Sequence, residues 1–292
     1  MNQRAVTASV WLLSGSSLLM VSATVVFAVL STIHQQDLVD LLFFSSCVLV
    51  GSLVALHRPR NVVGWYMLGG GFGFLLMTFS GHYALYGLIT RPGSLPGANV
   101  MAWPQTWLWI PGSASLFLLL PLYFPSGRLP SPRWSWLTRF IIVAAALTAV
   151  LAAINPGNNM IQVRSDQGTI VNPLGVRAAE SATLVSISSL VNVTIPVSEF
   201  VLLGAVAVSL VVRFTRSTGV ERQQLKWLTF SIAGLPVAIF LEQIVHPHVS
   251  FAALWLVTIP IGVGIAILKH NLYDIDLIIN RTLVYGALSA SV

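Results

Sequence analysis

The chain has 292 residues, of which 55% are hydrophobic and only 8% are charged. A water-soluble globule of this size needs more charged side chains to cover its surface, so the composition excludes an ordinary soluble domain and predicts a protein embedded in a lipid bilayer. The formal net charge of +6 does not indicate a nucleic-acid partner, because the basic residues are not gathered on one element with aromatic residues between them.

Eight apolar stretches follow one another along the chain, and each has the length of a membrane-spanning helix. A hydrocarbon layer about 30 Å thick needs about 20 helical residues, because each residue adds about 1.5 Å along the helix axis. The predicted spans are residues 10–33, 38–56, 62–89, 103–124, 136–154, 184–212, 225–245 and 251–268. A further apolar stretch from Thr282 to Val292 predicts a truncated ninth span. We therefore predict an all-α fold, a polytopic helical membrane bundle.

The basic residues lie mostly on one side of this predicted bundle. All but three of the 15 lysines and arginines lie before the first span, or within or beside every second connection, and the exceptions are Arg91, Arg164 and Arg177. The positive-inside rule therefore predicts that both termini are cytoplasmic, in a multi-pass protein of the cell membrane. In this scheme residues 1–270 form the bundle, 271–283 form a cytoplasmic amphipathic linker and 284–292 begin the truncated span.

Prolines and glycines interrupt several of these spans. Each proline removes a backbone hydrogen bond, so it predicts either a static bend or a hinge. The prolines are Pro104, Pro111, Pro121, Pro196, Pro236 and Pro260. The glycine-rich segment 69–73 lies inside an apolar span, which favours close helix packing over a phosphate-binding loop.

Polar residues within two neighbouring spans are candidates for a functional site. Glu199 lies near the middle of its span, where an ionised carboxylate facing lipid costs several kcal/mol, so we expect it to face the bundle interior. Two sets of residues each share one helix face: Ser188, Asn192 and Glu199 in one span, and Gln224, Ser231 and Glu242 in the next. They predict either a proton-sensitive or cation-binding site, or hydrogen bonds that only fix helix packing.

Four histidines fall near the predicted external ends of spans: His34, His82, His246 and His248. Imidazole groups could bind zinc or copper or sense pH, but their spacing is not a recognised metal motif, and solvated surface histidines are the simpler interpretation. We therefore predict no metal site and no cofactor. The sequence also contains no catalytic constellation, so the chain as given is not predicted to be an enzyme.

Four segments together carry a resemblance to a known family. They are residues 58–65 (RPRNVVGW), 124–130 (FPSGRLP), 221–228 (ERQQLKWL) and 272–286 (LYDIDLIINRTLVYG). This combination resembles the N-terminal membrane region of a group of bacterial multi-pass sensor histidine kinases. The resemblance implies two further membrane helices, a basic linker, a phosphoacceptor helix and an ATP-binding domain, and this kinase portion is absent from the sequence given. It also implies a homodimer, or a cytoplasmic kinase portion as partner, beside the lipid bilayer.

The segment after the eighth span is the candidate signal relay. Its apolar residues form a stripe along a predicted surface helix, whose polar positions are Asp274, Asp276, Asn280 and Arg281. The segment could pass helix motion onward, or it could be a passive anchor at the membrane surface.

The predicted function is a membrane sensory module that passes a helix rearrangement to a cytoplasmic output. An alternative is a small ion- or proton-coupled transporter or channel that uses the intramembrane carboxylates. A third is a structural membrane subunit that binds another helical protein.

Overall fold

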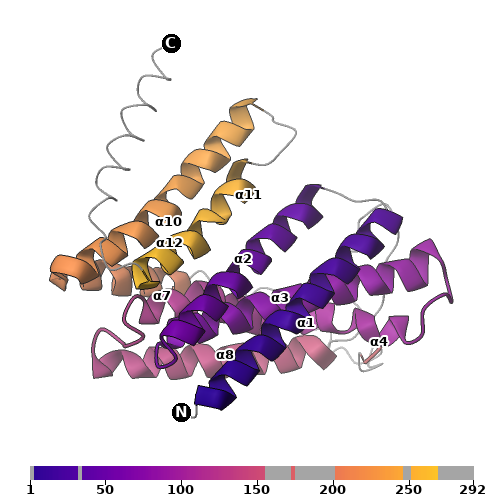
Figure 1. Ribbon diagram of the computed structural model, residues 1–292, viewed down its shortest axis with the longest axis horizontal. Helices are drawn as coiled ribbons and strands as arrows, with labels where there is room; N and C mark the ends of the chain where they lie inside the picture. Colours follow the sequence, from indigo (N-terminus) through magenta and orange to yellow (C-terminus); the bar gives the residue numbers. More distant parts are fainter. Residues whose placement is uncertain (1–2, 32–34, 155–171, 175–200, 246–250, 269–292) are drawn as a thin grey trace, which may run out of the picture.

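The computed structural model describes residues 3–31, 35–154, 172–174, 201–245 and 251–268 (Figure 1). Within these ranges every regular element is a helix and there is no β-strand, which confirms the predicted all-α fold class. The predicted span 184–212 is therefore described only from residue 201 onward and the predicted span 251–268 is described in full, whereas the linker and the truncated ninth span lie outside the described residues.

Four helical segments run side by side in the order α10, α12, α2 and α1 (Figure 1). Their bounds are Gly219–Val245 for α10, Thr258–Leu268 for α12, Gln35–His57 for α2 and Gln3–Leu30 for α1. A short helix, α11 (Phe251–Leu256), precedes α12 and is separated from it by a turn at Val257.

The central helix of the bundle is α3 (Val62–Leu85), which crosses α1 and α2 and also contacts the segments that follow it. It continues into a π-helical turn, η1 (Tyr86–Thr90). On its other side lie α8 (Ser135–Ile154), which follows the 3-10 turn η3 (Pro132–Trp134), and a broken helix. The pieces of the broken helix are α4 (Ala98–Ala102), α5 (Pro104–Trp107), α6 (Trp109–Ser113), the π-helical η2 (Ala114–Leu119) and α7 (Leu120–Tyr123). Residues 201–216 form a further helix.

Several of these helices have the character of membrane spans. Among the described residues four are long and apolar enough to cross a bilayer, and they are Gln3–Leu30, Leu38–His57, Val62–Thr90 and Pro132–Ile154. A fifth results if the pair Ala98–Trp107 and Trp109–Tyr123, bent by 40°, counts as one span. This number of apolar helices indicates a multi-pass membrane protein. The full set of eight spans and the sidedness of the termini stay predictions.

Two helix starts and two spans differ from the sequence prediction, and one of these spans, 251–268, is divided into α11 and α12 by the turn at Val257. Helices α1 and α10 begin at Gln3 and Gly219 rather than at residues 10 and 225, because backbone hydrogen bonding continues beyond the apolar residues that mark the lipid layer. The predicted span 103–124 is not one continuous helix, since it breaks at Leu108 between two prolines that lack a backbone N–H.

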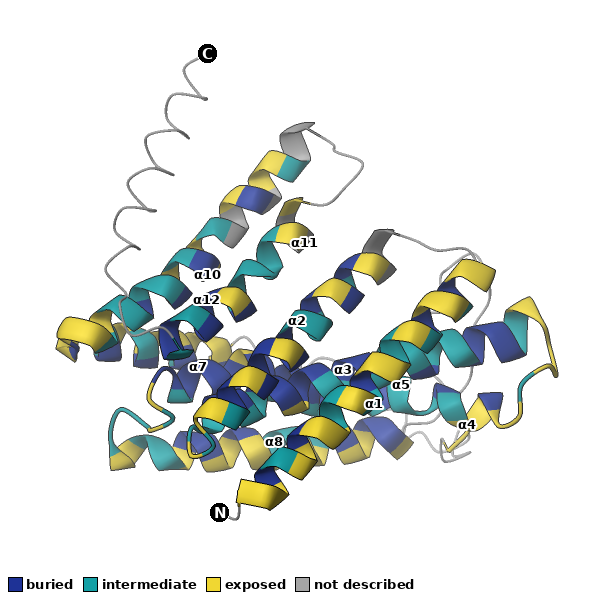
Figure 2. Cartoon of the chain, in the orientation of Figure 1, coloured by how far each residue is buried: buried dark blue, intermediate teal, exposed yellow. Residues whose placement is uncertain are grey.

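Many residues on the outer faces of the helices are exposed (Figure 2), and a large share of them are apolar. In α1 the side chains of Leu12, Leu18 and Leu19 are 71%, 68% and 73% exposed, respectively. Leucines exposed to this extent along one helix would form a large apolar patch in water, whereas a bilayer solvates them without cost. The exposed leucines therefore agree with a membrane location.

Glycines allow α2 and α3 to approach closely. A Cβ atom added at Gly51 would lie 2.5 Å from the backbone nitrogen of Leu68, and one added at Gly71 would lie 3.0 Å from the Cβ of Cys47. The packing predicted for the glycine-rich segment is thus confirmed at Gly71, and also at Gly70, which lies against Leu116. It is wrong for Gly69 and Gly73, which have nothing within 4 Å of an added Cβ.

Candidate functional site at the basic end of the bundle

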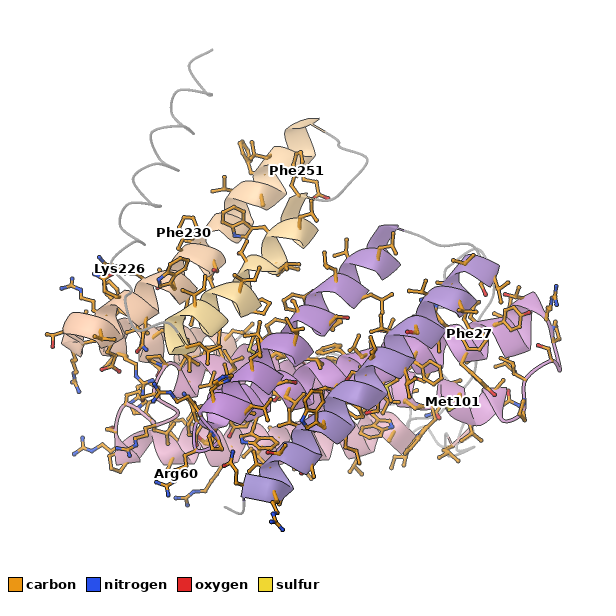
Figure 3. All side chains as sticks on the ribbon, in the orientation of Figure 1. Phe27, Arg60, Met101, Lys226, Phe230 and Phe251 are labelled. Carbon is orange, nitrogen blue, oxygen red and sulfur yellow. The ribbon has the colours of Figure 1, made fainter. Side chains whose placement is uncertain are left out.

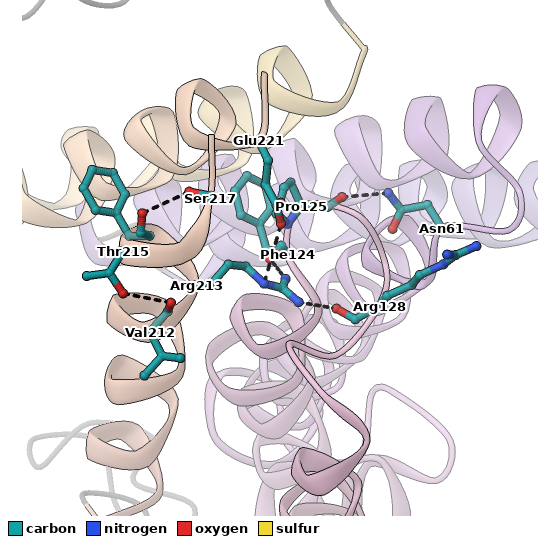
Figure 4. A network of polar contacts seen from close by, with 10 residues as sticks. Asn61, Phe124, Pro125, Arg128, Val212, Arg213, Thr215, Ser217 and Glu221 are labelled. Carbon is teal, nitrogen blue, oxygen red and sulfur yellow. Dashed lines mark hydrogen bonds and ion pairs between the residues drawn. The ribbon is translucent and has the colours of Figure 1, made fainter. Parts of the chain in front are cut away.

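Three connections rich in basic residues meet at one end of the bundle, which we call the basic end. The Asn61 side-chain Nδ2 donates to the carbonyl of Pro125 over 2.9 Å, which joins the connection before α3 to the loop after α7. The Arg213 guanidinium donates to the carbonyls of Phe124 and Arg128, which joins the helix 201–216 to the same loop (Figure 4). Segments far apart in the sequence are therefore hydrogen-bonded to one another here.

Arg213 lies at the centre of these contacts. Its side chain is only 7% exposed, and its Nε lies 3.8 Å from Oε1 of Glu221, which is 44% exposed. Burial lowers the pKa of the Arg213 guanidinium, and the charge of Glu221 raises it again. An arginine nevertheless keeps its proton throughout the neutral range, so the network contains a permanent buried cation. Its charge is balanced by two carbonyl dipoles and one partly exposed carboxylate.

The loop after α7 has a backbone shape that fits closely against Asn61. Gly127 adopts a left-handed conformation with φ of +74°, and its N–H donates to the carbonyl of Tyr123 over 2.9 Å. A Cβ added at Gly127 would lie 2.6 Å from Oδ1 of Asn61. That same oxygen accepts a hydrogen bond of 3.0 Å from the N–H of Val63, so Asn61 caps the start of α3 while it holds the loop.

A further contact connects the helix 201–216 to the first turn of α10. The guanidinium carbon of Arg222 lies 5.2 Å from the centroid of the Phe214 ring, which is within the range of a cation–π interaction. Together with the Arg213–Glu221 pair, this contact fixes the start of α10 beside the helix that precedes it.

A cavity of about 650 Å³ opens at the basic end between the connections 57–61 and 125–128. Gln224 of α10 and Ile267 of α12 complete its wall. Figure 3 shows that nitrogen-tipped side chains gather mainly at this end of the molecule, where Arg60 and Lys226 are labelled.

Two of the polar residues predicted from the sequence hold α10 against α11 and α12. The Ser231 hydroxyl lies 3.1 Å from the carbonyl of Thr258, and the carbonyl of Ser231 accepts a 2.7 Å hydrogen bond from Nε1 of Trp255. One turn from the start of α10, the Gln224 amide donates to the carbonyl of Ala266 over 2.6 Å. The structure therefore brings both residues to the neighbouring segment α11–α12, where each lies within hydrogen-bonding distance of a backbone carbonyl. The Ser231 hydroxyl lies equally close, at 3.1 Å, to the carbonyl of Trp227 in its own helix.

The remaining candidates are placed only in part. Glu242 is half-buried in the last turns of α10, and His82 is half-buried in α3. Outside the described residues lie Ser188, Asn192 and Glu199 of the first polar set, His34, His246 and His248 of the histidine group, and the relay residues Asp274, Asp276, Asn280 and Arg281. Within the described part of the chain no three histidine, cysteine or acidic side chains are close enough to hold a metal ion. The proton-sensitive site thus stays a prediction.

The sequence prediction missed Arg213 and Asn61 as members of a site. Asn61 had a local signal, because an asparagine directly before an apolar helix is a common N-cap. Arg213 had no such local signal, because a basic residue at the end of a span indicates only on which side of the membrane that end lies. Three of the four segments that carry the family resemblance, 58–65, 124–130 and 221–228, nevertheless contribute to the basic end.

The chain matches no family model, no curated protein and no solved structure. The geometry of the basic end is therefore the basis for a functional proposal.

Proposed function

We propose that the protein is a sensory module of the cell membrane, which passes a rearrangement of its helices to a cytoplasmic output. The observation that supports this proposal is the Arg213 network. One buried guanidinium connects the helix 201–216, the loop after α7 and the start of α10, so a shift of any one of these helix ends changes the contacts of the others. The excess of basic residues favours the cytoplasmic side for this end.

The path from the network to the output runs through α10 and α12. Gln224 and Ser231 contact α12 at two levels, so a tilt of α10 is passed to α12. The predicted relay segment follows α12 directly in the sequence. The output in this proposal is a kinase portion of the sensor histidine kinase type, as the resemblance implies.

A distance measurement across the basic end tests the proposal. Spin labels on cysteines introduced at Ser126 and Thr218, both exposed, would report the position of the loop relative to the start of α10. Cys47 is buried and would be replaced by serine to remove background labelling. In nanodiscs with lipids of increasing chain length, we expect the distance distribution to move between two populations, and Arg213→Gln to abolish the dependence.

A second pair of labels serves as a control. Leu49 of α2 is exposed and Gly69 of α3 has open space around it, and the two helices are in glycine-mediated contact. This pair should keep the same distance in every bilayer. An unchanged distribution for the Ser126 and Thr218 pair across bilayers of all thicknesses and charges would contradict the sensory proposal.

A transporter or channel is the second candidate function. It is favoured by the half-buried carboxyl group of Glu242 in α10 and by the break between α11 and α12, since broken helices often line transport sites. Proton flux into proteoliposomes that is lost in Glu242→Gln would support this candidate. The absence of flux above that of protein-free liposomes would exclude it.

A further inference from the structure

We propose that the cavity at the basic end binds a phosphate group, which is supplied by the headgroup of an anionic membrane lipid. The cavity has a volume of about 650 Å³, and its polar wall comes from the connections 57–61 and 125–128. This inference is independent of the sensory proposal, because a lipid can occupy the site whether or not the protein transmits a signal.

Three arginines give the cavity its charge. Arg58 and Arg60 precede α3, Arg128 lies in the loop after α7, and all three are exposed and line the cavity. Across the described ranges none of them pairs with a carboxylate, whereas the nearby carboxylate of Glu221 faces Arg213. Guanidinium groups present planar, paired donors that match the oxygens of a phosphate. The three side chains therefore form a site for an anion with several oxygens.

Most of the uncharged polar groups of the wall already have partners. The Asn61 amide bonds to Pro125 and Val63, and Gln224 bonds to Ala266. The Nδ1 of His57 lies 2.8 Å from the carbonyl of Leu53, which leaves its Nε2 as the available ring nitrogen. These contacts fix much of the wall, so the arginine donors, together with Nε2 of His57, remain for a ligand.

The position of the cavity favours a lipid over a soluble anion. It lies where α2 and α12 end and α3 begins, and Ile267 gives its wall an apolar part. Trp65 lies beside it, with Nε1 donating to the carbonyl of Pro59 over 3.1 Å, and tryptophan is enriched at the level of the lipid headgroups. Basic pockets between membrane helices at this level are suited to anionic headgroups.

Native mass spectrometry of the full chain, released from bilayers of defined composition, tests the site. We expect one phosphatidylglycerol molecule to be retained in preference to phosphatidylcholine, whose choline neutralises the phosphate, and to oleate, which is anionic but has no phosphate. The triple variant Arg58→Gln, Arg60→Gln, Arg128→Gln should lose about tenfold or more in affinity for phosphatidylglycerol, because each arginine near the surface strengthens the attraction.

A charge-matched variant separates the site from general surface attraction. Arg133, Arg139 and Arg216 are exposed but do not line the cavity, so replacing all three by glutamine removes the same charge. This control should retain the lipid like the unmodified protein. An equal loss in both variants, or equal retention of oleate, would overturn the proposal.

Inorganic phosphate distinguishes the two sources of the ligand. Retention of phosphatidylglycerol that millimolar phosphate does not affect assigns the site to the lipid. Binding of inorganic phosphate to the protein in neutral bilayers, lost in the first variant and kept in the control, supports the same phosphate site but assigns it to a free anion. Absence of both kinds of binding would overturn the proposal, and none of these outcomes depends on the distances measured between spin labels.

Discussion

Arg213 contributes more to stability than its charge partner does. Replacing Arg213 by alanine leaves the buried carbonyl of Phe124 and the partly buried carbonyl of Arg128 without their donor, which costs about 2 kcal/mol or more. Replacing Glu221 by glutamine removes only a 3.8 Å contact to a carboxylate that is 44% exposed and screened by water, so we expect less than about 1 kcal/mol. Thermal unfolding of the purified variants in detergent measures both losses of stability. Equal losses would contradict the view that Arg213 stabilises the protein mainly through its hydrogen bonds to the two carbonyls.

Gly127 is a second residue whose replacement has a defined consequence. Alanine there must adopt a φ of +74° and would also bring its Cβ to within 2.6 Å of Oδ1 of Asn61. Gly93 is a matched control, because it has a φ of +80° but nothing within 4 Å of an added Cβ. Backbone strain lowers the stability of both variants by about 1 kcal/mol, and only Gly127→Ala also displaces Asn61.

The measurement for this pair is the difference in the midpoint of thermal unfolding. We expect Gly127→Ala to have the lower midpoint. Equal midpoints would show that Asn61 moves aside without cost.

The close packing of α2 on α3 can also be tested by replacing glycine with alanine, in this case at a contact between two helices. Alanine at Gly51 would place its Cβ 2.5 Å from the backbone of Leu68, which cannot move without separating the two helices, so a loss of about 1–3 kcal/mol is expected. Alanine at Gly69 meets nothing and replaces a weak helix former, so it should be neutral or stabilising. Thermal unfolding compares the two variants, and a Gly51→Ala protein as stable as Gly69→Ala would contradict the close packing.

For the contact of α10 with the neighbouring segment α11–α12 we expect a smaller effect. Ser231→Ala removes the hydroxyl that lies 3.1 Å from the carbonyls of both Thr258 and Trp227, but it leaves the bond from Trp255 to the backbone of residue 231. Hydrogen bonds between membrane helices average about 0.6 kcal/mol, so we expect a loss of about that size. Thermal unfolding compares Ser231→Ala with Ser231→Thr, which keeps the hydroxyl. Equal losses of stability in the two variants would show that the effect comes from packing and not from the hydrogen bond.

At the scale of the whole molecule, the predicted sidedness can be tested by labelling the two ends of the bundle. Ser126 lies at the basic end, and Arg91 lies in the exposed turn that follows η1. With Cys47 replaced by serine, a cysteine at Arg91 should react with a membrane-impermeant reagent in intact cells, whereas one at Ser126 should react only after permeabilisation. Labelling of both in intact cells would contradict the predicted topology.

The sequence predicted the helical class and the approximate position of most described helices, because the length of an apolar stretch directly reflects the thickness of the bilayer. It identified Pro104 and Pro111 as sites of interruption, but the bend at Leu108 and the π-helical turns depend on how several helices pack together. The Arg213 network was not predictable for a related reason. Its acceptors are backbone carbonyls in a loop distant in sequence, and no local pattern of residues encodes such a contact.

Arg128 takes part in two interactions through different parts of the same residue. Its carbonyl accepts from Arg213, while its side chain lines the cavity. Main-chain acceptors impose no demand on side-chain identity, so a saturation library at position 128 should yield well-folded proteins with graded affinities for lipid. The same library at position 213 should yield proteins with a lower thermal stability, because every replacement removes the donor to two carbonyls. The side chain at position 128 can therefore change during evolution, and with it the ligand preference of the basic end. The hydrogen bonds from Arg213 that connect the helices there would remain.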